Sequence, residues 1–304
     1  MRYPQGILVS CEIPWDENER FMADIFREEV RAMIAKGYRQ IYIFGTCGEG
    51  YAVDTAMFRD IVTVFREETT SEEVLAQVGV ITLSTANAVE RIGIAHGLGF
   101  RVFQIALPSW GAVDDEEMMA FFKDVCGTFP DAKFLHYNLP RAKRTLNGHD
   151  YRRVADAVPN LVGTKNTTVS LRNIGDLMRH APELQHFLSE AGFPYGCLYS
   201  ECSILASFGG VSPAKMWQLF DAGKSGRFEE AFRIARDFDD VWSDVFSPTD
   251  YRQDPVDGVY DKMLVKFSGV DMPLRLLSPY KCFPDEVYEQ CRKILVEKYP
   301  EWLA

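Results

Sequence analysis

The chain has 304 residues, of which 47% are hydrophobic and 25% charged, so it can bury the core of a large single-domain α/β protein. Its net charge of −11 argues against a nucleic-acid-binding surface, and no apolar run reaches the roughly 18 to 20 residues of a membrane span. The seven cysteines form no CxxC pair, the five histidines form no HxxxH pair, and the amino terminus shows no signal segment. The sequence therefore predicts a cytoplasmic protein without a disulfide framework or a catalytic metal.

Short apolar segments alternate with amphipathic helical segments along most of the chain, which is the pattern of parallel βα units. Eight such strands with intervening helices close into a barrel more readily than they form an open sheet, so we expect an α/β fold of the (β/α)8 TIM-barrel type. The strands are expected at residues 7–11, 41–44, 74–79, 102–106, 133–137, 161–164, 185–188 and 203–207.

Helix-start signals lie between these strands. Ser84 can cap a helix, Asp114 opens an acidic first turn, and Pro213 suits a first helical position. After the eighth unit, residues 225–245 and 284–298 are expected to be helical, with residues 254–269 between them. We therefore expect a catalytic barrel of residues 1–224 and a C-terminal helical extension of residues 225–304.

Lys165 lies at the end of the short apolar segment 160–163 (NLVG) and is the most informative residue of the chain. Burial disfavours the ammonium form of a lysine, and this is useful where a neutral amine must attack a carbonyl to form a Schiff base. Taken alone, this segment favours a strand-end lysine that reaches solvent. The segments 45–50 (GTCGEG) and 136–140 (HYNLP) also follow expected strands, and the loops after barrel strands meet on one catalytic face. Together the three segments favour the catalytic interpretation.

A tyrosine, a glycine-flanked threonine and a lysine at one barrel mouth are the parts of a class I aldolase. With these motifs, and with the pattern of residues 273–279, the chain resembles the dihydrodipicolinate synthase and N-acetylneuraminate lyase superfamily from about residue 6 to 279. The resemblance implies that Lys165 forms the imine, that Tyr137 moves protons to and from it, and that Thr46 supplies a relay hydroxyl. For Tyr137 the alternative is a core tyrosine with a satisfied hydroxyl.

The resemblance also implies that the loop of residues 45–49 receives the substrate carboxylate. Cys47 stands where the family has a second hydroxyl residue, and a thiol is a weaker hydrogen-bond donor than a hydroxyl. We therefore expect the carboxylate at the backbone N–H groups of Thr46 and Cys47, in the turn that includes Gly48. A nucleophilic role for Cys47 has no nearby base in the sequence. Leu205 is expected to direct its backbone carbonyl toward the site.

Two positions separate this chain from dihydrodipicolinate synthases. Trp110 stands where those enzymes have a relay tyrosine, and Ala142 stands where they have an arginine for the second substrate's carboxylate. The neighbouring Arg141, Lys143 and Arg144 could replace that cation from other directions. The segment 108–110 (PSW) instead resembles the hydratase-aldolase branch, in which Trp110 would contact a bulky substituent; alternatively, Trp110 packs at a subunit contact.

The function expected from the sequence is that of a Schiff-base lyase, an aldolase or hydratase-aldolase, acting on a 2-oxo acid with pyruvate as product or co-substrate. The alternatives are a 4-hydroxy-tetrahydrodipicolinate synthase and a catalytically silent, ligand-binding barrel. No cofactor and no metal are expected. The partners are expected to be a small-molecule substrate and further copies of the chain in a homotetramer, with no nucleic acid and no membrane. Specificity is assigned to Trp110, residues 141–144 and residues 189–195.

Overall fold

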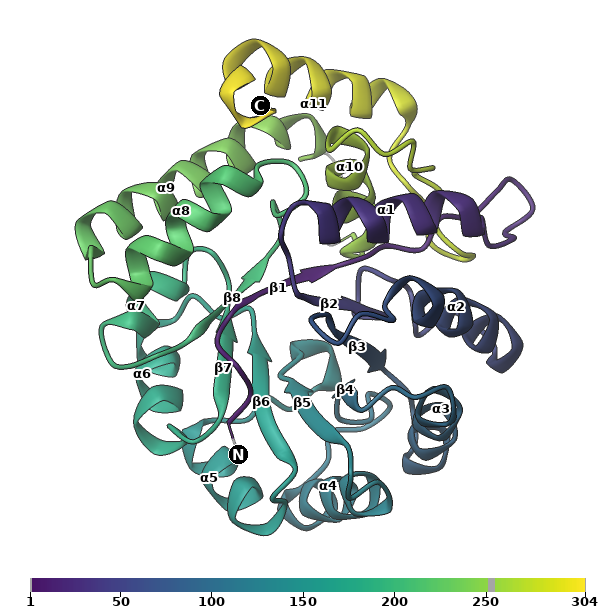
Figure 1. Cartoon of the computed structure of the whole chain (residues 1–304), viewed down its shortest axis with the longest axis vertical. Helices are drawn as coiled ribbons and strands as arrows, with labels where there is room; N and C mark the ends of the chain where they lie inside the picture. Colours follow the sequence, from purple (N-terminus) through teal and green to yellow (C-terminus); the bar gives the residue numbers. More distant parts are fainter. Residues whose placement is uncertain (1, 251–254, 304) are drawn as a thin grey trace.

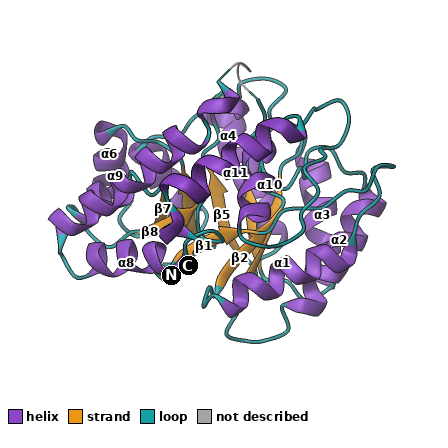
Figure 2. Cartoon of the chain, turned by 90° about the horizontal axis from the view of Figure 1, so that it is seen from above, coloured by secondary structure: helices purple, strands orange, loops and turns teal. Residues whose placement is uncertain are grey.

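The expected strands close into one parallel barrel. The structure is a computed structural model that describes residues 2–250 and 255–303. Each strand pairs with the next along the chain, and β8 pairs with β1. Figure 1 shows the strands at the centre of a ring of helices, and Figure 2 shows the same arrangement turned by 90°. The strands are β1 (Ile7–Ser10), β2 (Gln40–Ile43), β3 (Leu75–Val80), β4 (Val102–Ile105), β5 (Lys133–Tyr137), β6 (Leu161–Asn166), β7 (Gln185–Leu188) and β8 (Ser203–Ala206).

The strand at Lys165 is longer than its sequence predicts. The other strands begin and end within one residue of expectation, whereas β6 continues through Lys165 and Asn166 instead of ending at residue 164. Lys165 pairs with Phe187 of β7, and Asn166 pairs with Leu188. The lysine is therefore held between two neighbouring strands, and the alternative of a strand-end lysine that reaches solvent is wrong.

Capping side chains begin several of the barrel helices as expected. Ser84 accepts a hydrogen bond from the backbone N–H of Asn87, and Asp114 forms a capping box with Glu117. Pro213 occupies the first position of α8. The helices of the barrel are α1 (Ala23–Ala35), α2 (Thr55–Glu68), α3 (Thr85–Gly97), α4 (Asp115–Thr128), α5 (Gly148–Ala157), α6 (Leu171–His180), α7 (Phe193–Cys197) and α8 (Pro213–Lys224).

The C-terminal extension begins with a turn instead of a helix. Residue 225 was expected to start a helix, but α8 ends at Lys224 and Gly226 has a φ of +73°, a conformation that favours glycine. The extension contains α9 (Phe228–Val245), α10 (Gly258–Phe267) and α11 (Asp285–Lys298). The expected start of the intervening segment, residue 254, lies outside the described residues. These helices lie along the side of the barrel formed by α1 and α8 (Figure 1).

Side chains fill the barrel interior below the catalytic face. Leu8, Tyr42, Leu135 and Phe187 belong to one buried cluster inside the barrel, together with Tyr3. Tyr3 lies on the segment before β1, and its hydroxyl accepts a hydrogen bond from Gln77 at 3.1 Å. The lower end of the barrel is therefore packed, which leaves the opposite mouth for chemistry. In the part of the chain that the structure describes, no helix combines the length and apolar character needed to cross a bilayer.

Candidate active site

Lys165 is enclosed at the catalytic end of the barrel. Its side chain is only 2% exposed, and its Nζ lies 4.2 Å from the ring centroid of Tyr42 and 3.9 Å from that of Tyr137. Burial lowers the pKa of Lys165, although nearby acidic groups, Cys47 and Glu12 first, oppose part of this effect. The environment therefore favours the neutral amine that nucleophilic attack on a carbonyl requires.

Tyr42 on β2 contacts the lysine directly, a contact that the sequence interpretation missed. The Lys165 Nζ donates a hydrogen bond to the Tyr42 hydroxyl at 2.8 Å. Burial raises the pKa of Tyr42, so its phenol stays protonated near neutral pH. A sequence signal was available, since the two-residue period of a strand places Gln40 and Tyr42 on one face of β2. Tyr42 thus holds the amine in place.

Tyr137 and Thr46 form the second contact around the amine. Tyr137 ends β5 and pairs in register with Lys165. Its hydroxyl lies 3.2 Å from Thr46 Oγ1, and the Thr46 side chain is buried. Burial raises the pKa of Tyr137, so the phenol is a proton donor at neutral pH. Lysine, tyrosine and threonine are therefore brought together as the sequence predicts.

Glycine at position 45 allows the loop after β2 to lie close to Tyr42 and Lys165. A Cβ at Gly45 would lie 2.8 Å from the Tyr42 ring and 3.2 Å from Lys165 Nζ. Phe44 before it has a φ of +58°, which is uncommon for a large side chain and occurs here where the loop leaves β2. Gly48 lies close to the Phe44 backbone in the same turn, and a Cβ at this position would lie only 2.8 Å from the Phe44 backbone nitrogen. Gly48 thus shapes the loop.

The loop is anchored to the C-terminal extension through Glu49. Its carboxylate accepts hydrogen bonds from Lys262 Nζ at 2.6 Å, from Trp15 Nε1 at 2.8 Å and from the Leu277 backbone N–H at 2.6 Å. The side chains of Glu49 and Lys262 are both 0% exposed. Removing one partner of such a buried ion pair leaves an uncompensated charge, so the position of the loop depends on α10.

A buried carboxyl group, a half-buried one and a thiol lie beside the lysine. Atoms of Glu12, Cys47 and Asp261 lie within 4.8 Å of one another. Burial, and then repulsion by Asp261, raises the pKa of Glu12 to about 8, and burial raises that of Asp261 to about 7. Burial also raises the pKa of the Cys47 thiol, which disfavours a thiolate nucleophile. This group can therefore store protons close to the amine, a feature that the sequence interpretation did not include.

Two cavities lie at the end of the barrel where Lys165 is found. The inner cavity, of about 540 Å³, is lined by Lys165, Tyr137, Tyr42, Cys47 and Leu205 and also by Ser189 and Glu190 of the expected specificity segment. The outer cavity, of about 490 Å³, is lined by Arg141, Leu107, Tyr51 and Tyr280. Thr46 and Asp257 line both, so the two cavities adjoin at these residues. The arrangement offers one space next to the amine and one further out.

Of the remaining expected site residues, Arg141 lines a cavity, whereas Arg144 and Trp110 do not. Arg141 reaches the outer cavity, where its guanidinium forms a bidentate pair with Asp257 at 2.9 and 3.0 Å. Arg144 binds the Val113 carbonyl and Asp115 and lines neither cavity. Trp110 is 82% exposed and also lines neither cavity. Arg144 and Trp110 are thus not brought together with Lys165 in this chain.

The fold and this site together define a class of protein. A buried lysine with a lowered pKa, a tyrosine over its amine and a glycine-flanked threonine at the mouth of a (β/α)8 barrel are the parts of a class I, Schiff-base lyase. Residues 3–298 match the Dihydrodipicolinate synthetase family, and the chain belongs to that family.

Individual relatives are distant. The chain is 23% identical to an N-acetylneuraminate lyase from Citrobacter koseri over 59% of this chain and 60% of that protein. It is 24% identical to a 4-hydroxy-tetrahydrodipicolinate synthase from Chlorobium phaeovibrioides over 77% of this chain and 79% of that protein. Its fold is similar to that of an E. coli K12 prophage protein of the dihydrodipicolinic acid synthase family, solved in complex with pyruvate, with a TM-score of 0.84, 15% identity and coverage of 96% and 97% of the two chains. These identities leave the individual reaction open.

Proposed function

We propose that this protein is a Schiff-base lyase that acts on a 2-oxo acid, with pyruvate as product or co-substrate. The observation that carries the proposal is the environment of Lys165, whose buried amine contacts Tyr42 and Tyr137 and adjoins a cavity. In this chain the lysine has no salt-bridge partner among the described residues, unlike the buried Lys262. An unpaired, desolvated amine at a cavity is suited to attack a carbonyl.

The proposed reaction begins when the Lys165 nitrogen attacks the substrate ketone and water leaves, which gives a protonated imine. The imine accepts the electron pair of the breaking carbon–carbon bond, or of the C–H bond that is lost before water is eliminated. Tyr137, with Thr46 at 3.2 Å from its hydroxyl, delivers and removes the protons. After carbon–carbon cleavage, protonation of the resulting enamine and hydrolysis of the imine release pyruvate and restore the amine. After loss of water, hydrolysis of the conjugated imine releases an unsaturated 2-oxo acid and restores the amine.

Trapping with pyruvate and borohydride tests this proposal. We expect one reduced pyruvyl group per chain by intact mass, located on Lys165 by peptide mapping. Lys165→Met should abolish the adduct, whereas Lys123→Met, which removes an exposed lysine on α4, should leave it unchanged. An unmodified parent protein, or an adduct on Lys262, the second buried lysine, contradicts the proposed imine.

The charge of the inner cavity favours one class of substrate over another. Glu190, Asp239, Asp257 and Asp261 all line it. The negatively charged groups among them repel a second substrate carboxylate, and the fork of Arg141 is already occupied by Asp257. We therefore propose that the part of the substrate beyond the imine is neutral or hydroxylated, and that 4-hydroxy-tetrahydrodipicolinate synthase activity is negligible. Pyruvate release from a panel of 2-oxo acids, with aspartate semialdehyde plus pyruvate as the comparison, tests this; efficient use of the semialdehyde contradicts it.

We also propose a homotetramer in a reducing, cytoplasmic compartment. Trp110, 82% exposed on the loop after β4, is suited to a contact between subunits, and the seven cysteines are all unpaired. Light scattering should give the mass of a tetramer, which Trp110→Ala should lower. Titration of protein purified without reductant and then denatured should find seven thiols. A monomeric parent, or a protein with oxidised cysteines, contradicts the respective part of this proposal.

A further inference from the structure

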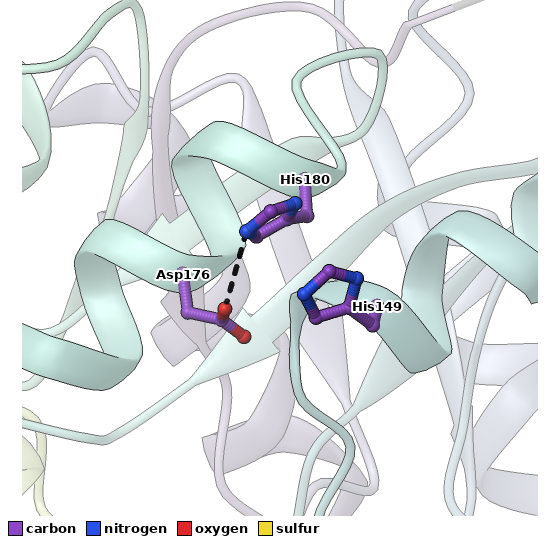
Figure 3. A group of neighbouring side chains, drawn as sticks. All are labelled: His149, Asp176 and His180. Carbon is purple, nitrogen blue, oxygen red and sulfur yellow. Dashed lines mark ion pairs between the residues drawn. The ribbon is translucent and has the colours of Figure 1, made fainter.

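Two histidines and an aspartate converge between α5 and α6, away from the inner and outer cavities. His149 lies in the first turn of α5, whereas Asp176 and His180 are four residues apart on α6. Figure 3 shows the three side chains directed toward the space between the two helices. The rings of His149 and His180 have their centroids 3.8 Å apart. Each residue offers one donor atom, and these atoms lie within 4.8 Å of one another.

The spacing of these atoms suits a shared metal ion. His180 Nε2 lies 3.6 Å from Asp176 Oδ1, which is longer than a normal hydrogen bond. Two ligands of one tetrahedral zinc ion, each at about 2.0 to 2.1 Å from it, lie roughly 3.4 Å apart. The two donor atoms are therefore already near the separation that a bound ion imposes. His149 is exposed, so its ring can rotate to bring its nitrogen to the same ion.

The aspartate is oriented by the backbone of the neighbouring helix. Its Oδ2 accepts a hydrogen bond from the Gly148 N–H at 2.6 Å, which leaves Oδ1 directed toward His180. A Cβ at Gly148 would lie 2.2 Å from the Asp176 backbone oxygen, so the two helices are in close contact at this point. A hydrogen bond that fixes a ligand from behind is a common support of metal sites.

A surface histidine–aspartate pair elsewhere in the chain differs from this cluster in its charged neighbours. His96 Nε2 lies 2.9 Å from Asp131 Oδ1, and Arg101 Nε lies 2.9 Å from Oδ2 of the same carboxylate. That carboxylate is neutralised by an arginine. At the site between α5 and α6 a second imidazole takes the place of the arginine, and an imidazole nitrogen can bind a metal ion, whereas a guanidinium cannot.

We propose that His149, Asp176 and His180 bind a divalent first-row transition metal ion, zinc above all, through two imidazole nitrogens and one carboxylate oxygen. Imidazole is a preferred ligand of zinc, copper and nickel, and three protein ligands leave the remaining positions to water. The ion joins α5 to α6. Because it binds the folded protein, it raises thermal stability in proportion to the logarithm of its concentration above the dissociation constant. It takes no part in the imine chemistry.

Calorimetric titration of the untagged, full-length protein with zinc chloride tests the proposal. We expect one zinc ion per chain and a rise in the melting temperature with zinc. His149→Ala and His180→Ala should each weaken binding by at least roughly 10-fold and remove most of the rise. His96→Ala, the matched control, should bind as the parent does.

The exposed thiol of Cys282 is a second group that can bind zinc, so the experiment must distinguish it from the site between α5 and α6. Cys282→Ser should leave the affinity and the stoichiometry unchanged. Asp176→Asn keeps an oxygen that can accept from Gly148 but removes the charge, so it should fold and yet bind zinc more weakly. Parent-like affinity in both histidine variants, or equal weakening by His96→Ala, overturns the proposal.

Discussion

Lys262→Met should unfold the protein at a lower denaturant concentration and disturb the loop that adjoins Lys165. The substitution leaves the Glu49 carboxylate without its charged partner at 2.6 Å, in a place where both side chains are 0% exposed. Trp15 Nε1 and the Leu277 N–H still donate to the carboxylate, but neither carries charge. Removing one partner of a fully buried ion pair costs about 3 to 5 kcal/mol, and we expect a loss of that size in the free energy of unfolding.

The assay is urea unfolding followed by circular dichroism, with borohydride trapping of pyruvate as a second measurement on the same variants. Glu49→Gln combined with Lys262→Met removes both charges and should recover much of the loss. Lys293→Met breaks an exposed pair with Glu297 at 3.9 Å and should be nearly neutral. A loss below about 1 kcal/mol for Lys262→Met, or no recovery in the double variant, would refute the reasoning.

Three further predictions concern groups around the amine. Tyr137→Phe should still form the pyruvate adduct but lower turnover by about 10² to 10⁴-fold, and turnover within a few-fold of the parent would show that another group moves the proton. Tyr42→Phe removes the hydroxyl at 2.8 Å from Nζ and should slow adduct formation at low pyruvate by about 10-fold, the equivalent of about 1.4 kcal/mol; an unchanged rate counts against its role. Glu12 keeps its proton in the folded protein up to about pH 8, whereas the unfolded chain loses it near 4.5, so this carboxyl makes the free energy of unfolding fall as the pH rises through that window. Glu12→Gln should reduce that fall in urea unfolding at pH 5 and pH 8, and an identical fall in both proteins contradicts the assignment.

The fold was accessible from the sequence because short apolar runs that alternate with amphipathic helical segments mark the buried parallel strands of βα units. Lys165, Tyr137 and Thr46 could be predicted for a related reason, since each stands at or just after a strand whose carboxyl end opens on the catalytic face. The end of β6 could not be predicted. Its last two residues are polar, and their pairing with the neighbouring strands, Lys165 with both β5 and β7 and Asn166 with β7, keeps them in the strand.

The residues that the sequence interpretation missed lie far from the motifs in the chain. Glu12 precedes the loop of residues 45–50 by more than thirty positions and Asp261 follows it by more than two hundred, yet both meet Cys47. Their proximity depends on how α10 packs against the barrel, and no local periodicity records that. Trp110 differs in the opposite way: a local motif suggested a contact with substrate, whereas its side chain is 82% exposed on the loop after β4.

The packed lower end of the barrel has a kinetic consequence. Tyr3 and Gln77 close that end with a hydrogen bond, and Gln104 Nε2 donates to Gln77 Oε1 at 2.7 Å, so small molecules enter and leave by the mouth alone. Pyruvate attached to Lys165, as proposed above, would lie innermost, with any second product between it and the exit. Release is then ordered, with pyruvate last. In initial-rate studies pyruvate should compete with the substrate for the free enzyme, whereas the product that leaves first should inhibit without competing.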